Sequence, residues 1–276
     1  MAPSFLLSLR EGLEAALIVS VTMGVLVRTR RTELLPAAWL GVALAAGLSV
    51  LTALALSWIG AELEGPAEQV FEGTTMIVAA ALLTWMILWL RAQGREIQQR
   101  LEADVRRTAL AGHRRAVFAI TFLAVLREGV ETAVFLTAAS FRPDAAGILF
   151  GGLGGLAASA ILGWGLYKTT LQLDLRRFFQ VTGFLLLLFA AGLVAQGVHE
   201  FNEVGLIPTL AGPIWDLSPV LSEETPAGGL LTALFGYNAD PSLTEAMAYV
   251  GYLVTLAFAF RPARPRPTGI APAPNR

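Results

Sequence analysis

The sequence contains no cysteine, and this absence narrows the chemistry available to the chain. Disulfides, thiolate metal ligands, cysteine-ligated iron–sulfur clusters and cysteine nucleophiles are all excluded. Histidine is nearly absent as well, since only two of the 276 residues are histidines. A metal site in this chain must therefore be built mainly from oxygen ligands.

Charged residues are also scarce. They make up 15% of the chain, against about a quarter in an ordinary soluble domain, and the net charge is −1. This balance provides no basic field for nucleic acid, so we expect no nucleic-acid partner. Hydrophobic residues reach 55% and the mean hydropathy is +0.63, more apolar surface than a water-soluble core can absorb. The lipid bilayer is the expected surrounding.

Apolar runs of about 20 residues predict an all-α integral membrane protein with seven transmembrane helices. No Lys or Arg precedes the first run and Arg10 interrupts it, so we interpret it as a retained helix and not as a secretory signal. The expected spans, each bounded by charges, Pro or Gly, are 4–27, 36–60, 68–90, 116–140, 144–167, 178–200 and 244–260.

Basic residues are concentrated on one set of connections between these spans. They lie at 28–31, 91–115, 168–177 and in the tail from residue 261, whereas the opposite connections are acidic and have only Arg142. Because Lys and Arg are retained in the cytoplasm, the N-terminus is expected outside and the C-terminus inside a plasma or inner membrane. We expect short or irregular structure in the outer loop 201–243, a helix or partly ordered loop at 91–115, and a disordered basic tail at 261–276.

A motif occurs twice. Residues 9–15, Leu-Arg-Glu-Gly-Leu-Glu-Ala, match residues 126–132, Leu-Arg-Glu-Gly-Val-Glu-Thr, 117 positions later. Three spans separate the copies, so they cross the membrane in opposite directions. This predicts a 3+3 inverted-topology repeat, about 4–90 against about 116–200, with the helix at 244–260 appended. Transporters built this way bind substrate near the bilayer midplane, where the repeats meet.

The motif places glutamates three residues apart, on one face of a helix. Glu11 with Glu14, and Glu128 with Glu131, can thus present four carboxylates where the helices face each other, a set suited to a hard cation. Arg10 and Arg127 can pair with these carboxylates, within their own motif or across the repeat, and keep them ionised. Charges inside a bilayer cost several kcal/mol, which points to function.

Three functions remain open on these residues. A metal-ion permease fits the doubled motif best. A membrane-embedded metalloenzyme could use the same carboxylates but would be expected to add histidines, and His113 and His199 both lie outside the motif helices. A cation-coupled carrier of an organic solute is the third. We expect no permanently bound cofactor and no enzymatic activity, and the sequence leaves a homo-oligomer open.

The paired Arg-Glu-Gly-x-Glu motifs in the first and fourth spans resemble the oxidase-dependent iron permeases, a family that includes the fungal high-affinity iron permeases and bacterial EfeU-type relatives. The resemblance covers about residues 1–260. It implies import of ferric iron that an extracytoplasmic ferroxidase or iron-delivery partner supplies, with Glu11, Glu14, Glu128 and Glu131 as ligands. Arg10 and Arg127 would be their electrostatic partners.

Further candidate residues lie toward the outer face. Phe71-Glu72-Gly73-Thr74-Thr75 resembles the family's third helix, and Glu72 is a candidate outer or second-sphere ligand; a carboxylate favoured by the helix N-terminus is the alternative. His199, Glu200 and Glu203 close the sixth span at spacings that share a helix face. They could receive an arriving cation, or they could form a simple hydrated helix end.

Overall fold

The computed structural model describes residues 2–141, 145–168, 175–222 and 225–260, and within these ranges every regular element is helical. The expected all-α fold is confirmed. The elements are α1 (Ala2–Arg28), the short 3-10 helix η1 (Thr32–Leu34), α2 (Leu35–Glu62), α3 (Pro66–Leu110), α4 (Arg114–Ser140), α5 (Ala145–Lys168), α6 (Leu175–Glu203), α7 (Pro226–Phe235) and α8 (Leu243–Ala259).

Four of these helical stretches are long and apolar enough to cross a membrane: Thr32–Glu62, Pro66–Leu90, Ala146–Gly165 and Arg177–Glu203. The chain is therefore a multi-pass membrane protein. Helices α1 and α4 are of comparable length, with 27 residues each, but each has three charged motif residues within it. Helix α8 is apolar and has 17 residues.

The third helix is longer than its membrane span. Residues 91–115 were expected to form a helix or a partly ordered loop. Residues 91–110 are helical and continue α3 without interruption from Pro66 to Leu110, and the chain turns at Gly112, whose φ is +70°. Hydropathy identifies only the apolar part of α3, Pro66–Leu90, that could lie in a bilayer. The polar continuation contains no proline, and charges of both signs are compatible with a solvated helix. The basic tail 261–276 lies outside the described residues.

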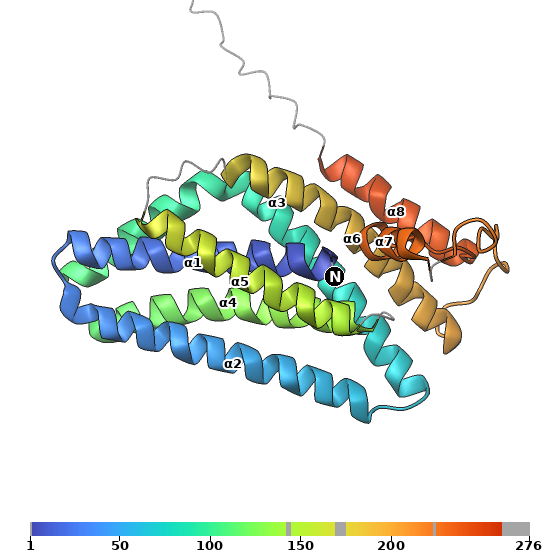
Figure 1. The fold of residues 1–276 in the computed structure, drawn as a ribbon, viewed down its shortest axis with the longest axis horizontal. Coiled ribbons are helices and arrows are strands. Elements are labelled where there is room, and N and C mark those ends of the chain that lie inside the picture. The colour runs from blue at the N-terminus through green and yellow to red at the C-terminus, as the bar shows by residue number, and fades with distance from the viewer. Residues whose placement is uncertain (1, 142–144, 169–174, 223–224, 261–276) are drawn as a thin grey trace, which may run out of the picture.

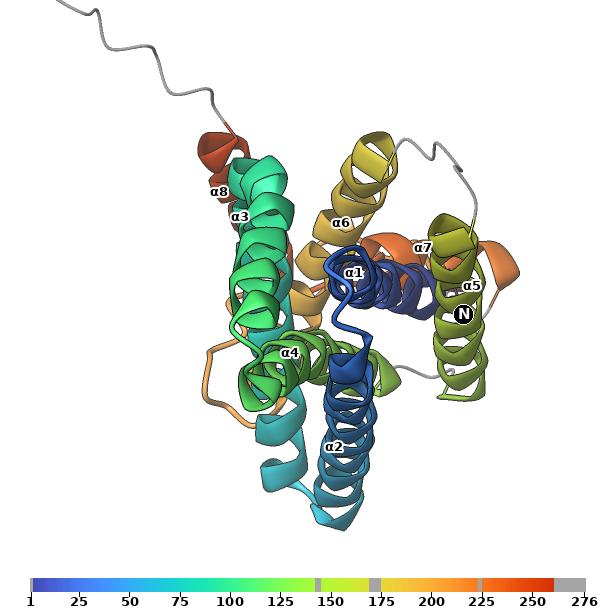
Figure 2. The same cartoon turned by 90° about the vertical axis from the view of Figure 1, so that its left-hand side faces the viewer.

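Each of the two motif helices packs mainly along one other helix. Helix α1 lies beside α5, α2 lies beside α4, and α3 packs on α6, with α1 near the centre of the bundle (Figures 1 and 2). Small residues permit these contacts. A Cβ added at Gly155 would lie 2.4 Å from the Phe5 carbonyl oxygen, and one at Gly41 would lie 2.9 Å from the Phe118 carbonyl oxygen. The helices therefore touch backbone to backbone.

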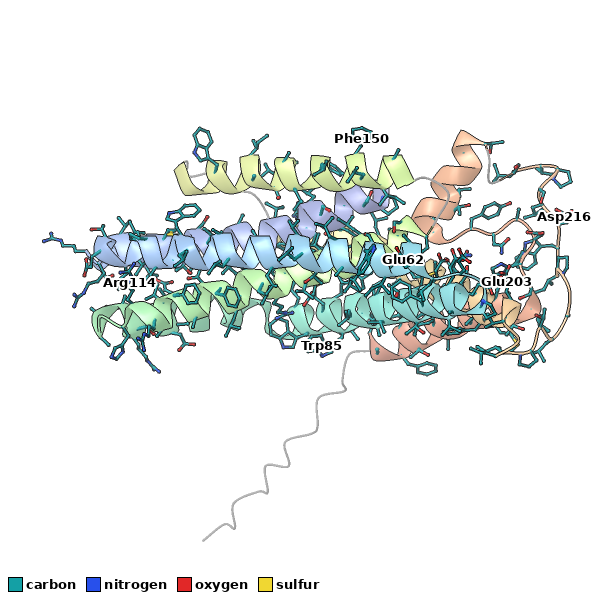
Figure 3. All side chains as sticks on the ribbon, turned by 90° about the horizontal axis from the view of Figure 1, so that it is seen from below. Glu62, Trp85, Arg114, Phe150, Glu203 and Asp216 are labelled. Carbon is teal, nitrogen blue, oxygen red and sulfur yellow. The ribbon has the colours of Figure 1, made fainter. Side chains whose placement is uncertain are left out.

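The bundle has two chemically different ends. Arg114 lies at one end, whereas Glu62, Glu203 and Asp216 lie at the other (Figure 3). We call these the basic end and the acidic end. Helix α4 begins at the basic end and α1 begins toward the acidic end, so the two motif helices run in opposite directions. Large apolar side chains such as Phe150 point outward, as expected for surfaces that face lipid.

Candidate metal site between the two motif helices

The first motif is sealed inside the bundle. Arg10 is 1% exposed, and its guanidinium forms ion pairs with two glutamates of its own motif, at 3.0 Å from Nη1 to Glu11 Oε1 and at 3.0 Å from Nη2 to Glu14 Oε1. Nη1 also contacts the sulfur of Met86 on α3 at 3.4 Å. One charge-assisted hydrogen bond to Glu11, the ion pair with Glu14 and a close-packed surrounding fix this guanidinium in place.

The second motif is paired in the same way but is more open. Arg127 donates from Nε to Glu131 Oε1 at 2.8 Å and lies 4.0 Å from Glu128 Oε1. Its side chain is 36% exposed. The centre of its guanidinium is 4.9 Å from the ring of Trp89 and 5.7 Å from that of Trp85, within the range of a cation–π interaction.

Three carboxylates from the two helices converge. Glu11, Glu128 and Glu131 each offer an oxygen within 4.8 Å of the others, and all three residues are buried. We call this set the carboxylate cluster. Glu14 lies beside it, where Arg10 holds it, with a side chain that is 14% exposed. The structure therefore brings three of the four predicted ligands together and ties the fourth to an arginine.

The carboxylate cluster has unused ligand capacity. Oε2 of Glu11, Glu128 and Glu131 are buried, and no donor among the described residues hydrogen-bonds to any of them. Burying a carboxylate oxygen without a partner is costly, and a cation bound between the three residues would remove that cost. The donor set contains only oxygen atoms, which suits a hard metal ion.

The motif glycines allow this close arrangement. A Cβ added at Gly12 would lie 2.1 Å from Ser159 Oγ on α5, and one added at Gly129 would lie 2.0 Å from Ser49 Oγ on α2. In both motifs the glycine is therefore the place where the partner helix makes contact. No pattern in the sequence names the two serines as the residues that these glycines meet.

The candidate outer residues lie at the acidic end of the bundle. His199 links two carboxylates, with Nε2 at 3.2 Å from Glu203 and Nδ1 at 3.1 Å from Glu245. A pocket of roughly 220 Å³ opens beside them, lined in part by Asn202, Asp240 and Ser242. Glu245 lies in the first turn of α8. It forms a capping box with Ser242 and also accepts from Asn238 at 2.8 Å.

Glu200 and Glu72 belong to the same end of the molecule. Gln196 donates to Glu200 at 3.4 Å, and Glu72 lies within electrostatic reach of Glu68 and Glu200. Helices α3 and α6 cross nearby, because a Cβ added at Gly73 would lie 3.0 Å from the Gly197 carbonyl oxygen. The outer candidates are therefore near one another but separate from the carboxylate cluster.

The positions of Trp85 and Trp89 were not predicted. The structure stacks the two indoles on each other and sets both over Arg127. The i, i+4 spacing does place them on one face of α3. Nothing in the sequence indicates which residue of another helix that face meets.

Buried ionisable residues on membrane helices, with oxygen atoms free to hold a cation, are typical of proteins that move ions across a bilayer. Comparison with known proteins identifies the particular family. The chain belongs to the iron permease FTR1 family, whose model matches residues 1–262, and the resemblance seen in the motifs is confirmed.

Curated relatives agree with this assignment. The chain is 38% identical over 260 residues to the ferrous iron permease EfeU of Escherichia coli O6:H1 (strain CFT073), covering 93% of this chain and 94% of the relative. It is 35% identical over 263 residues to EfeU of Yersinia pestis, covering 94% and 93%. These relatives are named permeases, so the chain is a transporter and not an enzyme. No solved structure gives a significant match.

Proposed function

We propose that this permease imports iron through the carboxylate cluster, with Glu11, Glu14, Glu128 and Glu131 as successive or shared ligands. The observation that carries the proposal is the meeting of three buried glutamates from two membrane helices, each with an oxygen that no described donor satisfies. Arg10 and Arg127 reduce the net negative charge of the empty site. The cation is cargo, so no permanently bound cofactor is required.

We propose ferric iron as the bound species. The relatives are named for ferrous iron, and this is compatible with ferrous iron reaching the outer face and being oxidised there by an extracytoplasmic ferroxidase partner. Support comes from the donor set, because carboxylate oxygens alone favour a hard, highly charged ion. His199, Glu200, Glu203 and Glu72 would then receive the ion at the acidic end.

Seven membrane-spanning helices complete the proposal, with α1 to α3 and α4 to α6 as inverted repeats, α8 as the seventh span, and the N-terminus outside. The first helix of each proposed repeat packs on the second helix of the other: α1 on α5, and α4 on α2. This exchanged pairing supports the inverted repeat, because a two-fold axis that relates the repeats would superimpose one pair on the other. The matched contacts of Gly12 with Ser159 and Gly129 with Ser49 support it as well. The acidic end would face outward, following the distribution of basic residues.

Iron uptake into proteoliposomes tests the function. Wild type, Glu128→Gln and Glu131→Gln are compared, with Glu33→Gln as a control at an exposed glutamate of the basic end. We expect uptake to be lost in both cluster variants and kept in the control. Folded wild-type protein that accumulates no iron, with or without a candidate oxidase, would contradict the proposal.

The same vesicles test the oxidation state. Ferric iron is supplied as a soluble chelate, and ferrous iron is supplied under reducing conditions without oxygen. We expect ferric uptake without an oxidase and no ferrous uptake under these reducing conditions. In a third arm, ferrous iron should be taken up only when a ferroxidase is present together with oxygen, which accepts the electrons. Uptake of ferrous iron alone under reducing conditions would make the ferric assignment wrong and leave the iron permease in place.

A further inference from the structure

The motif arginines flank the carboxylate cluster from opposite sides. Because α1 and α4 run in opposite directions, Arg10 precedes its glutamates on the side of the acidic end and Arg127 precedes its glutamates on the side of the basic end. Four residues of helix correspond to about 6 Å along the axis. The backbone of each arginine therefore lies about one helical turn nearer its own end of the bundle than the second glutamate of its motif, and its guanidinium reaches back to that glutamate.

These two guanidiniums are held by different contacts. Arg10 is enclosed at 1% exposure between two carboxylates and the Met86 sulfur, and the one aromatic ring recorded near its guanidinium, that of Phe179, is 6.0 Å away, farther than either indole is from Arg127. Arg127 is 36% exposed, hydrogen-bonds Glu131 through Nε, and presents its planar group to the indoles of Trp85 and Trp89. An arginine that dissociates from its carboxylate loses that ion pair, but Arg127 can keep its cation–π contacts with Trp85 and Trp89.

Burial along α1 and α4 also differs between the two sides of the carboxylate cluster. The buried residues of α1 fall in two groups, from Pro3 to Leu13 and from Thr22 to Leu26, and none of the residues 14–21 between them is fully buried. On α4 most residues from Glu131 to Ala139 are buried, whereas buried residues before Glu128 come about once per turn. Next to the carboxylate cluster, packing is thus tight on the side of the acidic end and looser on the side of the basic end, where a second buried group that includes Met23, Leu26 and Val117 lies farther along the helices.

We propose that Arg127 is the gate on the basic side of the carboxylate cluster, with Trp85 and Trp89 as the positioning residues that hold it when a cation takes its place on Glu131. Arg10 seals the opposite side in this conformation. The inference rests on the proposed cation transport and deepens it by naming how the ion leaves. A cation–π contact of ordinary strength changes such an equilibrium by about tenfold.

Transport kinetics test the role of the indoles. Trp85→Leu/Trp89→Leu removes both aromatic faces and keeps apolar side chains, whereas Trp85→Phe/Trp89→Phe keeps aromatic faces. Trp58→Leu is the control, because Trp58 is 68% exposed on α2 and belongs to no described cation–π pair. We expect the maximal uptake rate to fall about tenfold in the leucine double variant, with a much smaller change in half-saturating iron concentration. The phenylalanine double variant should retain most of the rate and Trp58→Leu all of it.

Thiol labelling tests the gate without depending on iron, and the chain has no cysteine of its own to interfere. Ile18→Cys places a thiol in the loosely packed stretch of α1, and Ser8→Cys places one in the closed half, where Ser8 is 0% exposed. A membrane-impermeant reagent applied at the basic end should modify Ile18→Cys at least several times faster than Ser8→Cys. Adding Trp85→Leu/Trp89→Leu should change the Ile18→Cys rate, and adding Trp58→Leu should not.

The outcomes separate the two proposals. If the wild type imports iron and the leucine double variant matches it in both uptake and labelling, the gate is wrong and the iron permease stands. If the wild type imports no iron but the labelling asymmetry and its dependence on the tryptophans persist, the gate stands and the proposed cargo is wrong. If the leucine variant fails to fold, the rate of Arg127→Lys decides: lysine keeps the charge but lacks the planar group, so an unchanged rate overturns the gate.

Discussion

Among single residues, the two motif arginines show how one sequence pattern can acquire two environments. Both occupy the first position of Arg-Glu-Gly-x-Glu and both pair with the glutamate four residues later. Arg10 is nevertheless enclosed by α3, whereas Arg127 lies under two indoles with a third of its side chain exposed. The electrostatic contribution of each arginine therefore depends on its neighbours.

This difference predicts unequal stability effects. Arg10→Gln leaves Glu11 and Glu14 buried without their counter-charge, so we expect the free energy of unfolding to fall by about 3 kcal/mol. Arg127→Gln removes a partly exposed pair, and we expect a loss below about 1 kcal/mol. Unfolding in bicelles, followed by circular dichroism, measures both. Equal losses would mean that burial does not separate the two motifs.

At the level of helices, small residues determine which surfaces meet. Gly12 and Gly129 each contact a serine of another helix, and Gly41 and Gly155 let backbones approach. In a bilayer, helix association depends on such close packing because lipid is as apolar as a leucine side chain. The small residues of α2 and α5 therefore specify the pairing.

Alanine at a motif glycine should force these helices apart. We expect Gly12→Ala and Gly129→Ala each to destabilise the protein by about 1 to 3 kcal/mol, because the new methyl carbon overlaps a serine. Thermal unfolding in detergent is the measurement. Ser159→Gly should recover much of the loss in Gly12→Ala. The control Gly47→Ala, where no atom lies within 4 Å, should be neutral or slightly stabilising; an equal loss there would exclude the steric explanation.

The helices were largely predictable from sequence, and their partners were not. Runs bounded by Pro, Gly and charges fixed six helices to within a few residues, because bilayer thickness sets the length of an apolar span. The polar extension of α3 to Leu110 was ambiguous because hydropathy does not report on a solvated helix. Spacing put Glu11 with Glu14, and Glu128 with Glu131, on one face of their helices, and three of these four carboxylates meet in the carboxylate cluster. The indoles over Arg127 and the link from His199 to Glu245 depend on contacts between distant helices, which no local pattern encodes.

For the whole molecule, the separation of charge between its two ends suggests a direction. Asp216 at the tip of the acidic end accepts a hydrogen bond from the Ser218 amide at 2.9 Å. The hydrogen bonds from Ser218 lower the pKa of Asp216 below its usual value, so this carboxylate keeps its charge in mildly acidic surroundings. A negative surface of this kind raises the local concentration of cations.

Sided labelling tests the orientation. Asp216→Cys and Thr32→Cys place single thiols at exposed positions of the acidic and basic ends. In intact cells, an impermeant maleimide should modify Asp216→Cys, and Thr32→Cys should react only after the membrane is opened. The reverse result would invert the proposed topology and with it the direction of transport.

The exchanged pairing of helices also constrains how the protein is made. Helix α1 emerges from the ribosome first, with Arg10, Glu11 and Glu14 already in its sequence, but its main packing partner α5 begins only at Ala145. Until α5 has been synthesised, the membrane-insertion machinery must accommodate a charged helix whose main packing partner is missing. Chains that end before α5 should therefore be recognised as faulty and degraded, so that the order of translation itself serves as a check on assembly.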